Sequence, residues 1–297
     1  MPKILLNLVI LTIYWRNSLS APISNFTKPT TLPKYFAIDV DGTFFIDDKT
    51  KFQRNVEAFK KLKQKNVTPF FCTGRDLVCT KRLIGDSFFN ETGYQGFPGL
   101  YLNGALIYGS DGNLLFVSKF TQDLITKFVE YFRSNDLMNK VFYYTIEATF
   151  SLEEIYDEGM EAIRSRSITV PAVVTLDELK AKDIISMTVF KDDLSDCEHM
   201  KEVHSVVYTS HAITSITPSK SNKKAGLQKL LEHLKSNENE CAFIGDDLND
   251  IEPMDYCYLS FAVADAKDEV KNKAKWVLDK KHDECAFENV VKLLYDD

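Results

Sequence analysis

The feature that most constrains the fold is a short apolar segment that ends in acidic residues. Residues 35–39 are mostly apolar, and Asp39 and Asp41 stand at the end, followed by Gly42 and Thr43. An apolar run bounded by a turn signal is typical of a buried strand, and side chains at i and i+2 lie on one side of it. Two such carboxylates repel each other unless a cation compensates, so the segment favours a Mg²⁺ site. The segment alone leaves an ordinary Asp-Gly turn open.

Strands and helices alternate towards both ends of the chain. Residues 55–65 carry apolar side chains on one face and lysines on the other, which predicts an amphipathic helix. Residues 67–72 are the next apolar run, and strand, helix and strand in this order make a βαβ unit with parallel strands. The alternation returns in the last third of the chain, with an apolar run at 241–244. We therefore predict an α/β fold with a doubly wound parallel-sheet (Rossmann-like) core, made of residues 33–114 and 211–297.

The middle of the chain lacks polar groups at its strand ends. Helices are predicted at 121–133 and 152–165 and strands at 141–146 and 184–190, and no carboxylate pair or Gly-rich turn follows them. We expect residues 115–210 to form an α+β cap domain inserted into the core. Charged cap side chains are expected to face solvent. Four of them are the alternative candidates for contact with substrate: Glu147, Glu153, Arg164 and Arg166.

The segment before the core resembles a targeting sequence. Lys3 precedes an apolar run at 4–14 that is too short to span a bilayer but suits a signal peptide, with cleavage expected before Ala21. We predict a signal peptide at 1–20 and an extended leader, rich in Pro, Ser and Thr, at 21–32. This predicts secretion or residence in the secretory pathway, with passage to an organelle left open, and no stable membrane association after cleavage.

The composition restricts the partners. The formal charge is −7 and the pI is about 5.4, whereas nucleic-acid-coating proteins carry basic faces, so no nucleic-acid partner is expected. The 6 cysteines include no CxxC pair. Cys72 and Cys241 lie in apolar runs and favour buried free thiols, although secretion would permit disulfides. The oligomeric state stays open.

Polar groups follow several predicted strands. Parallel strands place their carboxyl ends at one edge of a sheet, so these groups can converge there. Their residues and order resemble the haloacid dehalogenase-like (HAD) superfamily of phosphatases, more narrowly its Cof-type branch with a type IIB cap. The matching motifs are Asp39-Val-Asp41-Gly-Thr, Thr73-Gly-Arg75, Asn103-Gly-Ala, Lys223 after Pro218-Ser-Lys-Ser-Asn, and Gly245-Asp246-Asp-Leu-Asn249-Asp250.

One motif departs from the family pattern. The family usually has Gly after the motif lysine, where this chain has Lys224. Three lysines therefore compete for one role, namely Lys220, Lys223 and Lys224. The spacing from Pro218 favours Lys223.

The resemblance implies a role for each matched residue. Asp39 is the expected nucleophile, since a carboxylate with a pKa of about 3.9 needs no activating base. Asp41 is the expected general acid and base. Mg²⁺ is the expected cofactor, bound by Asp39, the Asp41 carbonyl and Asp246, with Asp250 close by. The expected phosphate and substrate contacts are Gly42, Thr73, Gly74, Arg75, Asn103, Lys223 and Asn249.

These roles predict a Mg²⁺-dependent phosphatase with an aspartyl-phosphate intermediate. A cap that closes over the site excludes macromolecules, so the resemblance implies small phosphorylated metabolites, such as sugar phosphates. The alternatives are a hexose phosphomutase of the phosphomannomutase type and a secreted binding protein without catalysis.

Overall fold

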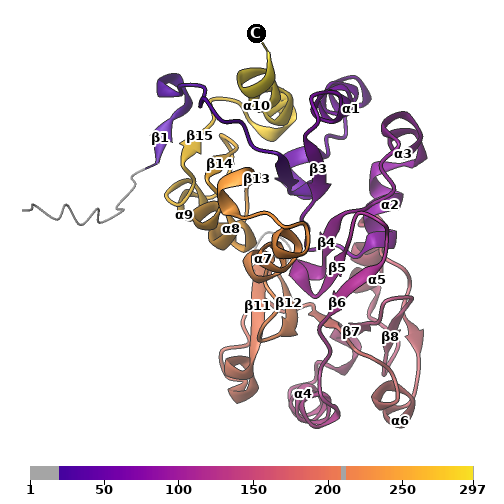
Figure 1. The fold of residues 1–297 in the computed structure, drawn as a ribbon. Coiled ribbons are helices and arrows are strands. Elements are labelled where there is room, and N and C mark those ends of the chain that lie inside the picture. Colours follow the sequence, from indigo (N-terminus) through magenta and orange to yellow (C-terminus); the bar gives the residue numbers. More distant parts are fainter. Residues whose placement is uncertain (1–19, 209–211, 297) are drawn as a thin grey trace, which may run out of the picture.

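The computed structural model describes residues 20–208 and 212–296. The expected signal peptide therefore lies outside the described residues, except for Ser20. The chain folds into a core and a cap (Figure 1), with the cap inserted between two halves of the core. This arrangement is the predicted α/β core with an α+β insertion.

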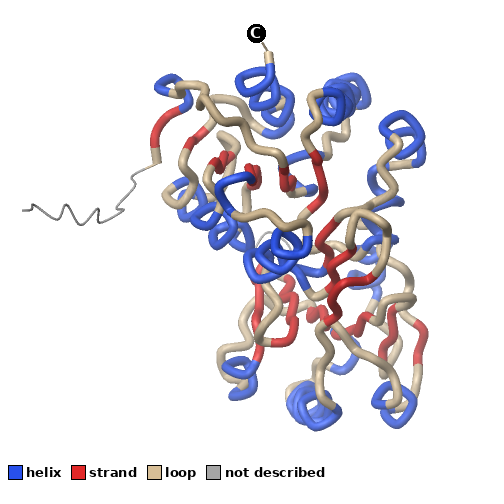
Figure 2. Tube along the Cα trace, in the orientation of Figure 1, coloured by secondary structure: helices blue, strands red, loops and turns tan. Residues whose placement is uncertain are grey.

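The core contains a parallel sheet of six strands in the order β1-β15-β14-β13-β2-β3. Helices α1 and α10 lie on one side of this sheet and α7 and α8 on the other (Figure 2). The strands are β1 (Ala21–Pro22), β2 (Tyr35–Ile38), β3 (Thr68–Phe71), β13 (Cys241–Gly245), β14 (Leu259–Ala262) and β15 (Trp276–Val277). The helices are α1 (Lys49–Gln64), α2 (Leu77–Ile84), α3 (Asp86–Thr92), α7 (Lys223–His233), α8 (Ile251–Tyr256), α9 (Asp268–Lys271) and α10 (Ala286–Tyr295).

A second core sheet has three antiparallel strands, β4 (Gly99–Tyr101), β5 (Leu106–Tyr108) and β6 (Leu114–Val117). A bridge between Cys72 and Leu100 joins it to the parallel sheet. Short 3₁₀ segments lie in the connections: Ile23–Asn25, Leu102–Gly104, Met138–Lys140, Glu198–Glu202, Glu238–Glu240, Leu248–Asp250 and His282–Glu284.

Burial and capping explain why these elements form. β2 lies between β3 and β13, and Phe36, Ala37 and Ile38 have no solvent exposure. Phe44 follows β2 and packs edge-to-face against five other phenylalanines. The helices begin at polar caps, because the side chains of Asp48, Asp76 and Asn222 accept backbone N–H groups of the first turn. The cap at Asn222 fixes the start of the helix that begins with Lys223.

The cap contains a mixed sheet in the order β11-β12-β10-β7-β8-β9. Its strands are β7 (Val141–Tyr144), β8 (Thr149–Ser151), β9 (Ala172–Val173), β10 (Ser186–Val189), β11 (Val203–Tyr208) and β12 (Ile213–Pro218), and its helices are α4 (Gln122–Ser134), α5 (Asp157–Ser165) and α6 (Leu176–Lys180). Successive side chains of a strand point to opposite faces. Tyr143 consequently packs with α4, whereas Phe142 and Tyr144 pack towards the core.

The domain boundaries differ from the predicted ones. β6 pairs with β5 in the core as far as Val117, so the cap begins after this strand rather than at residue 115. β12 pairs with β11 from Ile213 to Pro218, so the cap ends near residue 218 rather than 210. Whether such a hairpin belongs to the core or to the cap depends on its packing against distant segments, which the sequence pattern does not reveal.

The leader also differs from its prediction. Ala21 and Pro22 pair in parallel with Trp276 and Val277 and extend the core sheet. The ring of Phe26 packs edge-to-face against Phe261 and Trp276. The folded core therefore begins at about Ala21 rather than near Pro33.

All six cysteines are buried free thiols. Within the described part of the chain, no helix is both long and apolar enough to cross a bilayer.

Candidate active site

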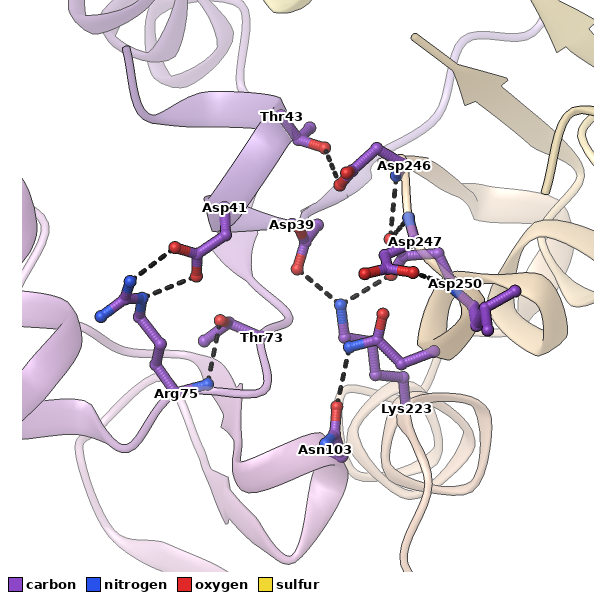
Figure 3. Close-up of polar contacts among 12 residues, drawn as sticks. Asp39, Asp41, Thr43, Thr73, Arg75, Asn103, Lys223, Asp246, Asp247 and Asp250 are labelled. Carbon is purple, nitrogen blue, oxygen red and sulfur yellow. Dashed lines mark hydrogen bonds and ion pairs between the residues drawn. The ribbon is translucent and has the colours of Figure 1, made fainter. Parts of the chain in front are cut away.

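The site lies at the carboxyl edge of the parallel sheet (Figure 3). Asp39 directly follows β2, and Asp246 directly follows the neighbouring strand β13. Lys223 is the first residue of α7, and Asp250 ends the 3₁₀ turn after β13. The sheet thus brings together residues about 200 positions apart, as the hydrogen bond between Thr43 and Asp246 illustrates.

Helix α7 carries Lys223 into the site because it packs very closely on the turn at Leu102–Gly104. A Cβ atom on Gly104 would lie 2.5 Å from the Asn222 carbonyl oxygen, and a Cβ on Gly226 would lie 2.5 Å from Leu100. Only glycine fits at such a close approach. The Asn103-Gly104 motif therefore has a packing role in addition to any contact with substrate.

Lys223 is buried between two carboxylates. Its Nζ donates to Asp39 Oδ1 at 2.5 Å and to Asp250 Oδ1 at 2.6 Å. Of the three rival lysines, Lys223 is thus the one that enters the site, since Lys220 is exposed and Lys224 lies over the ring of Tyr256.

The carboxylates outnumber this single cation. Oxygens of Asp39, Asp246 and Asp250 all lie within 4.8 Å of one another. Three ionised carboxylates and one ammonium leave two negative charges in a buried space. A divalent cation with a preference for oxygen ligands would balance this excess, so the donor set fits Mg²⁺.

The pKa values reflect the charge excess. Burial raises the pKa of Asp39 to about 8, although the charge of Lys223 acts in the opposite direction. Burial, then the charges of Asp39 and Asp250, raise the pKa of Asp246 to about 9. Burial alone would lower the pKa of Lys223, but Asp250 and Asp39 outweigh it and hold that pKa well above its ordinary value. Lys223 therefore stays protonated. Asp39 and Asp246 keep their protons until another cation displaces those protons.

The four predicted metal ligands are not equivalent. Asp250 Oδ2 accepts the backbone N–H groups of Asp246 and Asp247, and its Oδ1 accepts from Lys223. Asp250 therefore supports the loop, while Asp39 and Asp246 are the better placed carboxylates for a metal. Thr43 Oγ1 donates to Asp246 Oδ1 at 3.0 Å, which orients that carboxylate.

Gly42 allows the turn after β2 to approach Asp246. Its φ of +68° is in the left-handed region, and a Cβ atom there would lie 2.4 Å from Asp246 Oδ2. Glycine removes both the backbone strain and the clash.

Asp41 forms a bidentate ion pair with Arg75. Asp41 Oδ2 accepts from Arg75 Nε and Oδ1 accepts from Nη2, both at 2.6 Å. The Nη1 atom of Arg75 donates to the backbone carbonyl of Arg166 in the cap at 2.6 Å. The predicted acid/base residue is thus held by an arginine that also joins the core to the cap.

The remaining predicted contacts surround the site. Thr73 is buried, and its hydroxyl accepts the backbone N–H of Arg75. Asn249 Nδ2 donates to Asn103 Oδ1 at 2.9 Å and to the Tyr208 hydroxyl at 3.4 Å. Asn103 and Asn249 therefore hold each other beneath a tyrosine of the cap.

A cavity of about 310 Å³ opens between core and cap. Seven of the predicted site residues line this cavity: Asp39, Asp41, Gly42, Gly74, Arg75, Asp246 and Asn249. The other four do not line it: Thr73, Asn103, Lys223 and Asp250. The core also contributes Asp76, Cys79 and Asp247, and the cap contributes Tyr144, Arg166, Ile168, Thr188, Tyr208, Ile213 and Ser215.

Most of the cap residues at the cavity were not predicted. Of the four charged candidates, Arg166 lines the cavity, and the other three are exposed. Strand alternation could have paired Tyr144 with Thr188 on one face, but no motif marks which face meets the core. Asp247 belongs to the motif at residues 245–250, but the sequence analysis predicts a role only for its neighbours there.

Comparison with known proteins identifies the family. The sequence profile of haloacid dehalogenase-like hydrolases matches residues 36–288. The chain belongs to this family. Its Cof-type relatives include the 5-amino-6-(5-phospho-D-ribitylamino)uracil phosphatase YitU of Bacillus subtilis, 22% identical over 82% of this chain and 91% of that protein.

A plant relative is longer than this chain. The chloroplastic endoribonuclease YBEY of Arabidopsis thaliana is 23% identical over 80% of this chain, and the match spans 42% of the plant protein.

Solved structures share the complete fold. A HAD/COF-like hydrolase of Plasmodium vivax has a TM-score of 0.79 at 24% identity, covering 89% of this chain and 96% of that one. A subclass IIB sugar phosphatase has a TM-score of 0.75 at 19% identity, covering 87% of this chain and 98% of that one. The predicted fold class and enzyme class, a phosphatase of this HAD-like family, are confirmed.

Proposed function

We propose that this HAD-like phosphatase depends on Mg²⁺ and hydrolyses small phosphate monoesters, such as sugar phosphates, through a phosphate bound covalently to Asp39. The observation that carries this proposal is the excess of negative charge at the cavity, where the buried Asp39 and Asp250 and the half-buried Asp246 face one lysine. Asp39 and Asp246 both line the cavity and belong to this cluster. Of the two, Asp39 accepts from Lys223 and stands where the family resemblance places the nucleophile, so we assign it the attack on a bound phosphate.

Asp39 and Asp246, with the carbonyl of Asp41, would hold the metal, and Asp250 would support them from behind. When bound, Mg²⁺ supplies positive charge that offsets the repulsion between the Asp39 carboxylate and the phosphate. Lys223 orients Asp39 through its 2.5 Å hydrogen bond, and its charge favours the ionised form of Asp39 that the attack requires.

The proposed reaction has two displacements at phosphorus. An oxygen of Asp39 bonds to phosphorus while the bond to the leaving oxygen breaks, and Asp41 gives its proton to that oxygen. Asp41 then removes a proton from water, which attacks phosphorus, releases inorganic phosphate and restores Asp39. Arg75 occupies one lone pair on each Asp41 oxygen, and each oxygen retains another for these proton transfers.

The cavity supports small substrates. Its volume of about 310 Å³ and its wall of both core and cap residues suit a molecule that the two parts can enclose. The sugar phosphatase among the structural neighbours is compatible with this choice of substrate class.

The test is phosphate release from 4-nitrophenyl phosphate and from hexose phosphates, with Mg²⁺ and with EDTA. We expect Mg²⁺-dependent release by the wild type and none by Asp39→Asn. Release by the variant would refute the attack by Asp39. No release by the wild type with any divalent metal would refute the proposal and favour a binding protein. Isomer formation from hexose phosphates without release would favour the phosphomutase alternative.

Localisation to the secretory pathway also remains a proposal, based on the signal predicted at residues 1–20. Expression in secretory cells followed by N-terminal sequencing tests it, and a mature protein that begins at Ala21 is the expected result.

A further inference from the structure

The two walls of the cavity carry different charges. The core wall is acidic, with Asp39, Asp41 and Asp246 at the proposed metal site. The cap wall offers hydroxyl groups from Tyr144, Thr188, Tyr208 and Ser215 and apolar surface from Ile168 and Ile213. Arg166 is the one charged side chain among the described cap residues at this cavity.

The backbone of Arg166 is fixed to the core. Its carbonyl oxygen accepts from Arg75 Nη1 at 2.6 Å and from Cys79 Sγ at 3.1 Å. Arg166 also ends α5, since its N–H donates to the carbonyl of Ala162. The half-buried side chain therefore starts from a defined position beside Asp41 and Arg75.

The charge of Asp41 acts on the guanidinium of Arg166, but Asp41 and Arg166 form no ion pair with each other. Within residues 20–208 and 212–296, no side chain forms a hydrogen bond or ion pair with it. The nearby carboxylate of Asp41 already binds Arg75 through both oxygens. Burial, and next to it the like charge of Arg75, lower the pKa of Arg166.

A guanidinium stays charged in proteins, so the cavity contains a partly desolvated positive charge that an anion would neutralise. The carboxylates of Asp39 and Asp246 belong to the proposed metal and phosphate site in the core wall. Arg166 lies in the opposite wall, which the cap forms. A substrate whose phosphate lies at Asp39 would direct its leaving group past Asp41 towards this wall.

We propose that Arg166 binds a second anionic group, a carboxylate or a second phosphate, on the leaving-group part of the substrate. This inference rests on the proposed function and narrows its substrate class. The preferred substrates carry the phosphate monoester at one end and a second anionic group at the other. Arginine pairs with carboxylate and phosphate through two parallel N–H···O bonds. The hydroxyl groups of the cap wall suit a polar segment of substrate between its two anionic groups.

Two matched substrate pairs test this specificity. 6-Phosphogluconate and sorbitol 6-phosphate are both open-chain and differ only by a carboxylate in place of a hydroxymethyl group at the end remote from the phosphate. 3-Phosphoglycerate and glycerol 3-phosphate differ in the same way. We expect kcat/KM to be about 10-fold or more higher for the acid in each pair, since a hydrogen-bonded charge contributes at least this factor. Arg166→Gln should remove the preference and leave the neutral member within about twofold.

Arg164→Gln is the matched control. Arg164 belongs to the same helix α5, is exposed and does not line the cavity, so its loss should change neither member of a pair. An equal decrease of both members in Arg166→Gln, or no preference in the wild type, would overturn the inference while leaving the phosphatase proposal intact.

A binding measurement covers the case of no turnover. Isothermal titration calorimetry with Asp39→Asn should show tighter binding of 6-phosphogluconate than of sorbitol 6-phosphate, and Asp39→Asn/Arg166→Gln should bind both alike. Equal affinities in Asp39→Asn would contradict the role of Arg166. Absence of phosphate release alone would contradict only the proposed function.

Discussion

Among single residues, Lys223 supplies the buried positive charge of the site. It is fully buried, and its ammonium is shared by Asp39 and Asp250. A buried ion pair offers little net stability when intact, because both partners lose their hydration. Removal of one partner is different, since the other charge then remains buried and unpaired.

Lys223→Met is therefore expected to lower the free energy of unfolding by about 3 kcal/mol and to lower kcat by about 100-fold or more, because Asp39 loses the donor that orients it. Urea denaturation and phosphate release measure the two effects. Lys224→Met is the control, because the neighbouring lysine forms only a cation–π contact with Tyr256. Comparable losses in both variants would contradict the assignment of the site lysine.

The raised pKa values of Asp39, about 8, and Asp246, about 9, predict how pH affects the metal-free protein. Unfolded Asp loses its proton near pH 3.9, while the folded protein retains these protons. The folded state thus binds more protons, and its stability falls as pH rises, until the folded groups also ionise at about pH 8 to 9.

Thermal unfolding with EDTA should accordingly show Tm falling from pH 6 to 9, and the gain in Tm from MgCl₂ should increase over the same range, because Mg²⁺ needs ionised ligands. Asp246→Asn should flatten both trends. A Tm gain from Mg²⁺ that does not change with pH, or is equal in the variant, would argue against this cluster as the metal site.

At the scale of elements, the turn after β2 lies against Asp246, which follows β13. Gly42→Ala would place a methyl group 2.4 Å from Asp246 Oδ2 and would also strain a φ of +68°. Gly93 separates the two effects, since it is left-handed with a φ of +64° and a methyl group added there would only touch Lys63 Nζ at 3.6 Å.

Both Gly42→Ala and Gly93→Ala should lose about 1 kcal/mol of unfolding free energy from the left-handed backbone. Only Gly42→Ala should lower kcat/KM, by about 100-fold, as a shift of about 1 Å in a catalytic group does. Chemical denaturation and steady-state kinetics measure the two quantities. If Gly42→Ala retains full activity, the turn does not position Asp246.

The elements of the core were largely predictable, and those of the cap wall were not. Asp39, Lys223 and Asp246 follow from local signals, because a buried strand and its turn, or a capped helix start, occupy a few consecutive residues. Tyr144 and Thr188 reach the cavity through pairing between β7 and β10. That register depends on contacts between distant segments, as does the edge pairing of β1, whose two residues are too few for a periodic pattern.

For the molecule as a whole, the segment before β2 belongs to the stability of the core. Phe26→Ala should lower the free energy of unfolding by about 2 kcal/mol, less than the ~3–5 kcal/mol of a fully buried phenylalanine, because Phe26 is half-buried. Its ring contacts Phe261 and Trp276, far from the cavity, so kcat should not change. Ser24→Ala, at an exposed position, is the control. An unfolding midpoint in urea that matches the wild type would show that this segment does not pack on the core.

The strand order also determines when the site can form during synthesis. β2 pairs with β3 on one side, but its other partner, β13, emerges from the ribosome about 200 residues later, after the entire cap. Until then, one edge of a wholly apolar strand is open to pairing with other chains, which favours aggregation. Asp39 likewise meets Lys223 and Asp246 only in a nearly finished chain. A nascent or truncated chain therefore has the proposed nucleophile without its partners, and the site is complete only after the last third of the sequence has been synthesised.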